Sequence, residues 1–279
     1  MPNWTELPLV GLDTETTGLS LTDDRVFEVA LVTYQGGEQA EAWTHMLDPL
    51  KPLSAESSEK TGVTNADLAG KPAFASVAGE VVDRLADRVV VGYNILGFDL
   101  PLLENELKRV GLALPRCWPV DVLVFARELI RGGRHNLGEM VKHYGITMDT
   151  AHRAAADADA SVRLLLAMAR DLPSDLDALT RLQAQWRDSQ RARKAVWRQK
   201  SDDRGGGDAL LHQEVAPSAS FVDEQGRISL GPTYVYGRET DPLRSFLLTY
   251  CNATARATAS IGDAAAPSAG AAAPVADPA

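Results

Sequence analysis

Residues 7–34 have the sequence LPLVGLDTETTGLSLTDDRVFEVALVTY, and this stretch decides the fold. The apolar run at 7–13 predicts a buried strand. Residues 25–34 predict a second strand with apolar side chains on both sides, Val26, Ala30 and Val32 on one and Phe27, Val29 and Leu31 on the other. A Gln35-Gly36-Gly37-Glu38 turn then leads into AEAWTHML, a third expected strand. The chain is therefore expected to begin with an antiparallel meander.

The pattern then changes to helices that alternate with strands. Strands are expected at VVVGYN (89–94) and near Trp118–Val120. Helices are expected near 74–86, 121–130, 136–144 and 153–170, with one more that carries Leu102, Leu103 and Leu107. A hairpin sheet followed by such units is typical of an α/β fold.

Four parts are expected along the chain of 279 residues. Residues 1–174 are long enough for one core domain, and 175–204 form a basic helical segment that ends in a flexible linker. Residues 205–252 form a small unit, in which FVDEQGRISL resembles a hairpin and Asp241-Pro242 starts a helix. Residues 253–279, rich in Ala and Pro, are expected to be disordered because they bury too little apolar surface.

The basic segment carries eight Lys or Arg residues against three acidic ones between 181 and 204. A solvated helix face explains it, and so does a contact with nucleic acid or a partner. The part after residue 174 could therefore recruit a partner. The whole chain has a net charge of -10, which argues against binding nucleic acid by bulk electrostatics.

Composition excludes several classes of protein. Hydrophobic residues make up 45% and charged residues 24%, which excludes wholesale disorder. Cys117 and Cys251 lie far apart, so neither a disulfide framework nor a structural zinc site is indicated. No stretch approaches the ~18 apolar residues of a membrane span and no signal peptide is evident, so we expect a cytoplasmic protein without a membrane partner.

The first chemical motif is DTETTG, residues 13–18, directly after the first expected strand. Asp13 and Glu15 project from the same side of an extended backbone. Two such carboxylates repel each other unless a cation lies between them, and their oxygen atoms suit Mg²⁺ or Mn²⁺. A capped turn is the alternative interpretation of an isolated pair.

Two further motifs supply acids. Asp99, in NILGFD at the end of an expected strand, is either an N-cap before Pro101 or a third carboxylate at the mouth of the sheet. Asp157, in HRAAAD, lies beside the apolar stripe of the helix expected at 153–170. His152 opens this motif and differs from the other histidines because three candidate metal carboxylates accompany it.

Taken in order, DTETTG, NxxFDxxLL and HxAxxD resemble the three motifs of the DEDDh family of 3′→5′ exonucleases, which includes the epsilon proofreading subunit of bacterial DNA polymerase III and ribonuclease T. The resemblance covers residues 7–170. It implies a ribonuclease-H-like, mixed five-stranded sheet flanked by helices, and it says little about the small C-terminal extension. Lys60-Thr61-Gly62 departs from the family, in which many members have histidine before the glycine.

The resemblance also implies the site and its chemistry. Two Mg²⁺ or Mn²⁺ ions are expected on four acids with His152 as general base, and the acids are Asp13, Glu15, Asp99 and Asp157. Substrate contacts are expected from Thr16, Thr17, Gly18, Leu19 and Phe98, although core packing is an equal alternative for Phe98.

The expected function is release of nucleoside monophosphates from single-stranded or frayed 3′ ends, with DNA preferred. The expected setting is proofreading or repair, with a DNA polymerase as a candidate partner. RNA trimming is the alternative within the same chemistry, because the motifs do not place contacts to the 2′-hydroxyl. A noncatalytic nucleic-acid- or polymerase-binding module is the alternative from another class.

Overall fold

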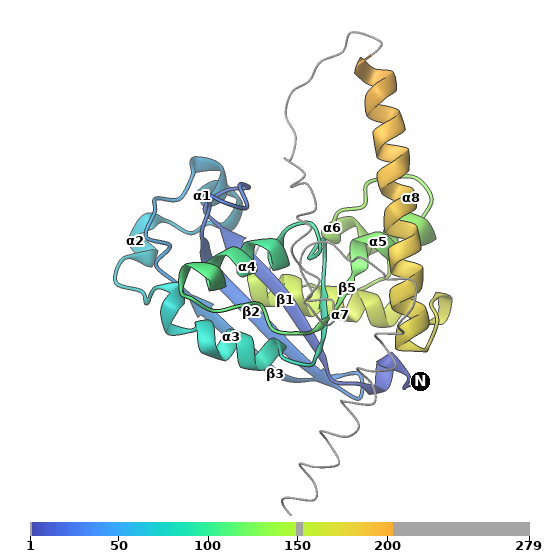
Figure 1. Cartoon of the computed structure of the whole chain (residues 1–279), viewed down its shortest axis with the longest axis horizontal. Coiled ribbons are helices and arrows are strands. Elements are labelled where there is room, and N and C mark those ends of the chain that lie inside the picture. The colour runs from blue at the N-terminus through green and yellow to red at the C-terminus, as the bar shows by residue number, and fades with distance from the viewer. Residues whose placement is uncertain (1, 149–152, 203–279) are drawn as a thin grey trace, which may run out of the picture. The chain divides into compact units, whose positions relative to one another are not determined.

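The computed structural model describes residues 2–148 and 153–202. Its centre is one five-stranded sheet with the strand order β3-β2-β1-β4-β5 (Figure 1). The strands are β1 (Leu9–Thr16), β2 (Val26–Gln35), β3 (Glu38–Met46), β4 (Val89–Gly92) and β5 (Trp118–Asp121). β1 is antiparallel to β2 and parallel to β4, so the sheet is mixed, as expected from the sequence.

The first three strands form the expected meander. β2 and β3 are joined by Gly36 and Gly37, whose φ angles of 61° and 84° require the left-handed region that glycine enters without strain. Two such residues suit the tight hairpin turn whose twist matches that of the flanking strands. β2 is buried over most of its length, because both of its sides carry apolar residues.

Strand β1 is longer than the sequence predicted. The first strand was expected to end at Asp13, but Thr14, Glu15 and Thr16 continue to pair with β2, opposite Val29, Glu28 and Val26. A register shift between Glu15 and Thr16 ends the regular ladder. Glu15 therefore lies within the strand, as Asp13 does, and not in the turn after it.

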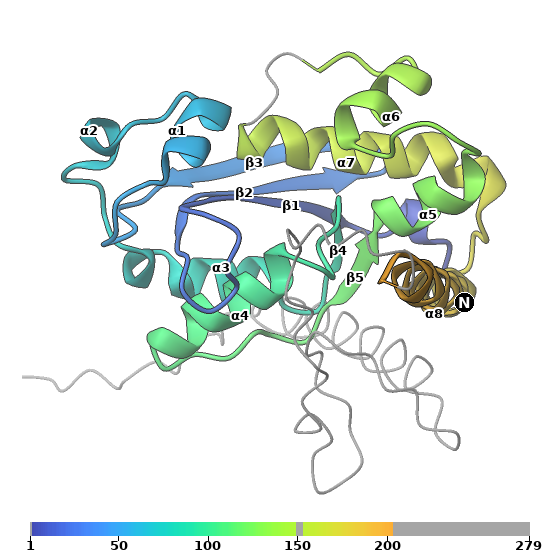
Figure 2. The same ribbon diagram turned by 90° about the horizontal axis from the view of Figure 1, so that it is seen from above.

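Helices cover both faces of the sheet (Figure 2). On one face α7 (Ala154–Met168) crosses β1, β2 and β4, and α6 (Leu137–His143) packs against α7. On the other face lie α3 (Ala78–Leu85) and α4 (Asp99–Arg109), whose apolar side chains share a core with β1 and β2. The helices expected from the sequence at these places are confirmed.

At the edge formed by β5 lies α8 (Leu176–Asp202), which contacts β5 and packs against α5 (Val122–Leu129), the helix that follows β5. The first turns of α8 are fixed by buried Leu176 and Leu179 and by Gln183. The amide group of Gln183 bonds the β5 backbone, accepting from the N–H of Asp121 and donating to the carbonyl of Pro119. α8 thus continues the domain as the helix expected at 175–200.

Short elements complete the fold. The sequence did not predict α1 (Ala55–Thr61) or α2 (Asn65–Leu68), which follow β3, nor the 3-10 turn η1 (Trp4–Glu6). The 3-10 turns η2 (Phe74–Ser76) and η3 (Ala169–Asp171) lie at the ends of the helices expected at 74–86 and 153–170. The linker was expected at 201–208, but Ser201 and Asp202 belong to α8, and its other residues lie outside the described part of the chain. The hairpin expected at 221–230, the helix from Asp241 and the tail from 253 also lie outside the described residues. Among the helices that are described, none is long and apolar enough to span a membrane.

Candidate metal centre

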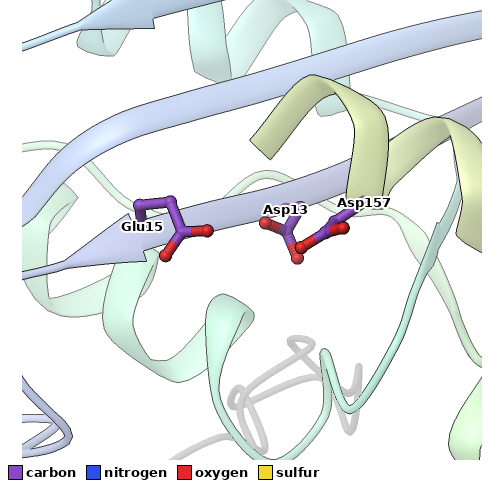
Figure 3. Close-up of side chains that lie close together, drawn as sticks. All are labelled: Asp13, Glu15 and Asp157. Atoms are coloured by element: carbon purple, nitrogen blue, oxygen red, sulfur yellow. The ribbon is translucent and has the colours of Figure 1, made fainter. Parts of the chain in front are cut away.

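Three carboxylates from two elements meet at the end of β1 (Figure 3). Asp13 and Glu15 project from the strand, and Asp157 reaches them from the first turn of α7. Each residue offers one oxygen atom, and these three atoms lie within 4.8 Å of one another. Glu15 is buried, whereas Asp13 and Asp157 are half-buried, so the cluster has a route to solvent.

Helix α7 can lie this close to β1 because position 11 is glycine. A Cβ atom on Gly11 would lie 2.7 Å from the carbonyl oxygen of Ala158 and 2.9 Å from Cγ2 of Val162. No side chain fits there without moving backbone. Asp157 immediately precedes Ala158, so the same close approach brings its carboxylate to the strand.

Asp99, the fourth expected acid, is held on the backbone of β1. Its Oδ1 atom accepts hydrogen bonds from the N–H and the hydroxyl group of Thr14, at 3.0 and 2.7 Å. Thr14 lies beyond Gly11, the last residue of β1 that pairs with β4, so Asp99 satisfies a backbone N–H that the shorter strand leaves free. Asp99 is not the N-cap of α4, because Phe98 holds that position.

Asp121 shapes the loop that delivers Asp99, a role that the sequence did not suggest. Its carboxylate accepts hydrogen bonds from the N–H groups of Asn94 and Leu96, at 2.9 and 3.2 Å. Asn94 has a φ of 69°, which starts the tight turn into α4. The only sequence signal was an acidic residue at the start of the helix expected at 121–130, directly after an expected strand.

The acids raise one another's pKa. Burial raises the pKa of Asp13 well above its ordinary range, and the charges of Asp99, Asp157 and Glu15 raise it further. Burial raises the pKa of Glu15 from 4.5 to about 7, while the positive charge of Lys60 opposes this. Near neutral pH the cluster therefore resists full ionisation. A hard divalent cation, which carboxylate oxygens bind well, removes this repulsion.

The pKa of Asp99 is also raised, to about 6, with burial as the main cause. The hydrogen bonds from Thr14 act in the opposite direction, because they stabilise the ionised carboxylate. Thr14 thus favours the charged form of this acid.

Near the cluster lie three charged residues for which the sequence predicted no role, Lys60, Glu28 and Arg153. Lys60, exposed on α1, lowers the pKa of both Asp13 and Glu15. Arg153 forms a salt bridge with Glu28, which lies opposite Glu15 in the β1–β2 ladder. A lone glutamate within the apolar run VFEVALV was the signal for Glu28, and the third motif itself contains Arg153.

The expected substrate contacts fall into two groups. The hydroxyl groups of Thr16 and Thr17 donate within the chain, to the carbonyl of Gly18 at 2.6 Å and to Asp24 at 2.7 Å. Gly18 lies so close to Asp24 that a Cβ atom would meet its carboxylate at 2.5 Å. By contrast, Leu19 is 63% exposed, and Phe98 is partly buried against the core. His152 lies outside the described residues.

The sheet and its acids define a class of protein, an α/β domain with a cluster of carboxylates, able to hold a metal ion, at its central strand. The chain belongs to the exonuclease family, because the RNase T exonuclease model matches residues 10–165, more than half of its length. This confirms the family that the ordered motifs indicated.

PolC-type DNA polymerases III are among the proteins similar in sequence to this chain. PolC-type DNA polymerase III of Streptococcus suis is 32% identical over 163 residues, which is 58% of this chain and 11% of the polymerase. The corresponding protein of Halalkalibacterium halodurans is also 32% identical, over the same shares. The chain therefore spans only about a tenth of the length of these relatives.

Solved structures of E. coli exonuclease I share the fold. A complex with a dT13 oligonucleotide matches with a TM-score of 0.52 and 18% identity, over 58% of this chain and 41% of that one. A zinc-bound complex with single-stranded DNA matches with a TM-score of 0.54 and 18% identity, over 60% of this chain and 41% of the other. The likeness at this level of identity confirms the fold.

Proposed function

We propose that this chain hydrolyses phosphodiester bonds at the 3′ ends of nucleic acids, with single-stranded or frayed DNA preferred, and releases nucleoside monophosphates. The observation that carries the proposal is the cluster of Asp13, Glu15 and Asp157, whose three ligand oxygens lie within 4.8 Å of one another. Membership of the exonuclease family supports the same chemistry.

DNA is favoured over RNA by what is similar to this chain. The relatives are DNA polymerases, and the exonuclease I structures hold single-stranded DNA or a dT13 oligonucleotide. A role in proofreading or repair, with a DNA polymerase as partner, agrees with the same relatives. RNA is the alternative substrate, and parallel digestion of matched DNA and RNA distinguishes the two.

The residues present fit two divalent cations, Mg²⁺ or Mn²⁺. Asp13, Glu15, Asp157 and Asp99 would hold them, because all four offer carboxylate oxygens at the same end of the sheet. When bound, such cations stabilise the attacking and leaving oxygens of an in-line displacement.

The remaining groups act on protons and on the nucleotide. In the DEDDh mechanism that the HxAxxD motif implies, a ring nitrogen of His152 takes the proton of the attacking water, which an imidazole with a pKa of about 6.5 can do near neutral pH. Leu19, exposed on the loop after β1, offers apolar surface to a terminal base. Thr16, Thr17 and Gly18 shape that loop, and Phe98 lies at the start of α4.

The deciding experiment is digestion of matched, end-labelled single-stranded DNA and RNA by the full chain, with Mg²⁺, with Mn²⁺ and with EDTA. We expect shortening from the 3′ end that EDTA abolishes, with DNA cut faster. Asp13→Asn should remove activity, whereas Asp83→Asn, an exposed acid on α3, should not. Activity in EDTA, or in the Asp13 variant, would exclude the proposed mechanism.

The role of His152 has a separate test. His152→Ala should lower turnover by at least 100-fold, the usual contribution of a positioned general base being roughly 10²–10⁴. The Michaelis constant for the oligonucleotide should change little. A variant with normal turnover would remove His152 from the mechanism and leave the carboxylate cluster in place.

A further inference from the structure

Arg153 connects strand β2 to helix α7 through two different groups. Its side chain donates from Nη2 and Nε to the two carboxylate oxygens of Glu28, at 3.1 and 3.3 Å. Its carbonyl oxygen accepts hydrogen bonds from the N–H groups of Ala156 and Asp157, at 2.9 and 3.1 Å. One residue therefore ties the backbone of Asp157 to the strand beside β1.

Arginine is an unfavourable residue at the start of helix α7, where Arg153 lies. It occupies the N-cap position of α7, where its side chain makes no capping hydrogen bond. Ser, Thr, Asn or Asp at this position would bond a free N–H group, and a positive charge there opposes the helix dipole. Local helix stability therefore does not account for arginine here. The salt bridge with Glu28 on β2 accounts for it.

Glu28 is equally unusual for its place in the sheet. It is 1% exposed, within a strand whose neighbouring side chains are apolar, and it lies opposite Glu15. A carboxylate buried to this extent needs a counter-charge. The planar guanidinium of Arg153 engages both of its oxygen atoms, a geometry that also fixes direction.

We infer that Glu28 and Arg153 are positioning residues for the hydrolysis proposed above. Their two-bond ion pair fixes the first turn of α7 against β2, and this holds the carboxylate of Asp157 within reach of Asp13 and Glu15. Gly11 sets how closely α7 approaches the sheet, and the ion pair sets where the helix begins along it. The inference rests on the proposed function, because it concerns the same acids.

The first test is Arg153→Lys, which keeps the charge but loses the planar fork. We expect turnover to fall about tenfold or more, with little change in the Michaelis constant for an oligonucleotide, since residues that orient metal ligands act at this level. Binding of Mn²⁺, measured by calorimetry without substrate, should weaken by a similar factor. Arg163→Lys is the matched control, because Arg163 pairs with Asp159 on the same helix and should leave both values unchanged.

A second variant separates positioning from simple stability. Arg153→Met alone leaves Glu28 buried without its counter-charge and is expected to destabilise the fold. The double variant Glu28→Gln/Arg153→Met removes both charges and should recover stability. Its affinity for Mn²⁺ should nevertheless stay below that of the wild type. In the metal-free protein, the amide proton of Asp157 should exchange faster than in the wild type. Restored stability with wild-type turnover, Mn²⁺ binding and exchange would overturn the inference.

The two proposals fail in different ways. If the wild-type chain does not hydrolyse nucleic acid, the proposed function fails, while Mn²⁺ binding and amide exchange still decide whether the pair positions Asp157. If the wild-type chain is active and the double variant matches it in turnover and Mn²⁺ binding, only the role of the pair fails.

Discussion

The carboxylate of Asp99 replaces a strand as the partner of Thr14. It accepts the backbone N–H and the hydroxyl proton of Thr14 at a point where β4 has already ended. Thr14→Val keeps the shape and removes the hydroxyl donor. We expect a loss of stability of about 1.5–3 kcal/mol, the usual effect of a hydrogen bond to a charged group. Urea unfolding measures it, with Thr33→Val on β2 as the control.

The same variant should change the pH dependence of activity. The hydrogen bonds from Thr14 lower the pKa of Asp99, so removing one of them should raise that pKa further above 6. The acidic limb of the pH–rate profile in Thr14→Val should therefore move to higher pH. A profile that coincides with that of the wild type would show that ionisation of Asp99 does not limit the rate.

Gly11→Ala should separate α7 from β1. The added Cβ atom would meet the carbonyl oxygen of Ala158 at 2.7 Å, and backbone atoms cannot yield cheaply. We expect a loss of stability of about 1–3 kcal/mol from overpacking, together with reduced turnover because Asp157 moves with the helix. Gly79→Ala on α3, where nothing lies within 4 Å, is the control and should be neutral or stabilising. Equal effects of the two changes would contradict this account of Gly11.

Without metal, stability should fall as the pH rises through the range in which Glu15 titrates. The pKa of Glu15 in the fold, about 7, lies above its ordinary value of 4.5, so the folded chain binds this proton more tightly than the unfolded chain. The stability that the protonated Glu15 contributes is fully present below pH 4.5 and is lost as the pH rises through about 7.

The measurement for Glu15 is urea unfolding in EDTA between pH 5 and 8, with Glu15→Gln for comparison. The Gln variant should lose less stability over this range, and Glu59→Gln, exposed on α1, should follow the wild type. Saturating Mg²⁺ or Mn²⁺ should oppose the loss, because a cation replaces the proton. Parallel curves for the wild type and Glu15→Gln would contradict the prediction.

Asp13→Asn should make the metal-free protein more stable while it removes activity. Asp99, Asp157 and Glu15 all repel an ionised Asp13, and the neutral amide removes this repulsion. The melting temperature in EDTA should rise by about 2–4 °C for each kcal/mol relieved. Added Mn²⁺ should then stabilise the variant less than the wild type. A lower melting temperature in EDTA would show that Asp13 serves the fold through contacts other than this charge.

Lys60 offers a test of the charge balance from outside the acid cluster. Its charge lowers the pKa of Glu15, so Lys60→Gln should raise that pKa above 7. Binding of Mn²⁺ competes with the proton, so its pH midpoint should move upward. Lys71→Gln is the matched control, because the charge of Lys71 acts on Asp67 instead. Equal midpoints in the two variants would exclude an effect of Lys60 on the site.

The sequence predicted the parts of the fold that depend on local pattern. Alternating apolar residues and a Gly36-Gly37 turn were enough for the meander, and the three motifs were enough for the family. The end of β1 was predicted too early, at Asp13, because Thr14, Glu15 and Thr16 look like turn residues unless their pairing with β2 is known. Pairing between strands is not visible in the local pattern of one of them.

Two relationships at the site could not be predicted because they join distant residues. Asp99 and Thr14 are 85 residues apart, and Arg153 and Glu28 are 125 residues apart. Each residue alone has an ordinary explanation, as a cap, a strand residue or a surface charge. Only the close packing of α7 and the early end of β4 bring them together.

Strand β1 lies in the middle of the sheet, and this position keeps its two acids in place. An acid-bearing segment at an edge could bend into solvent and let its charges drift apart. The segment from Asp13 to Thr16 pairs with β2 on one side, and on the other side the backbone N–H of Thr14 donates a hydrogen bond to Asp99. The like charges of Asp13 and Glu15 are therefore held in a rigid frame, so that a cation would bind ligands that are already assembled.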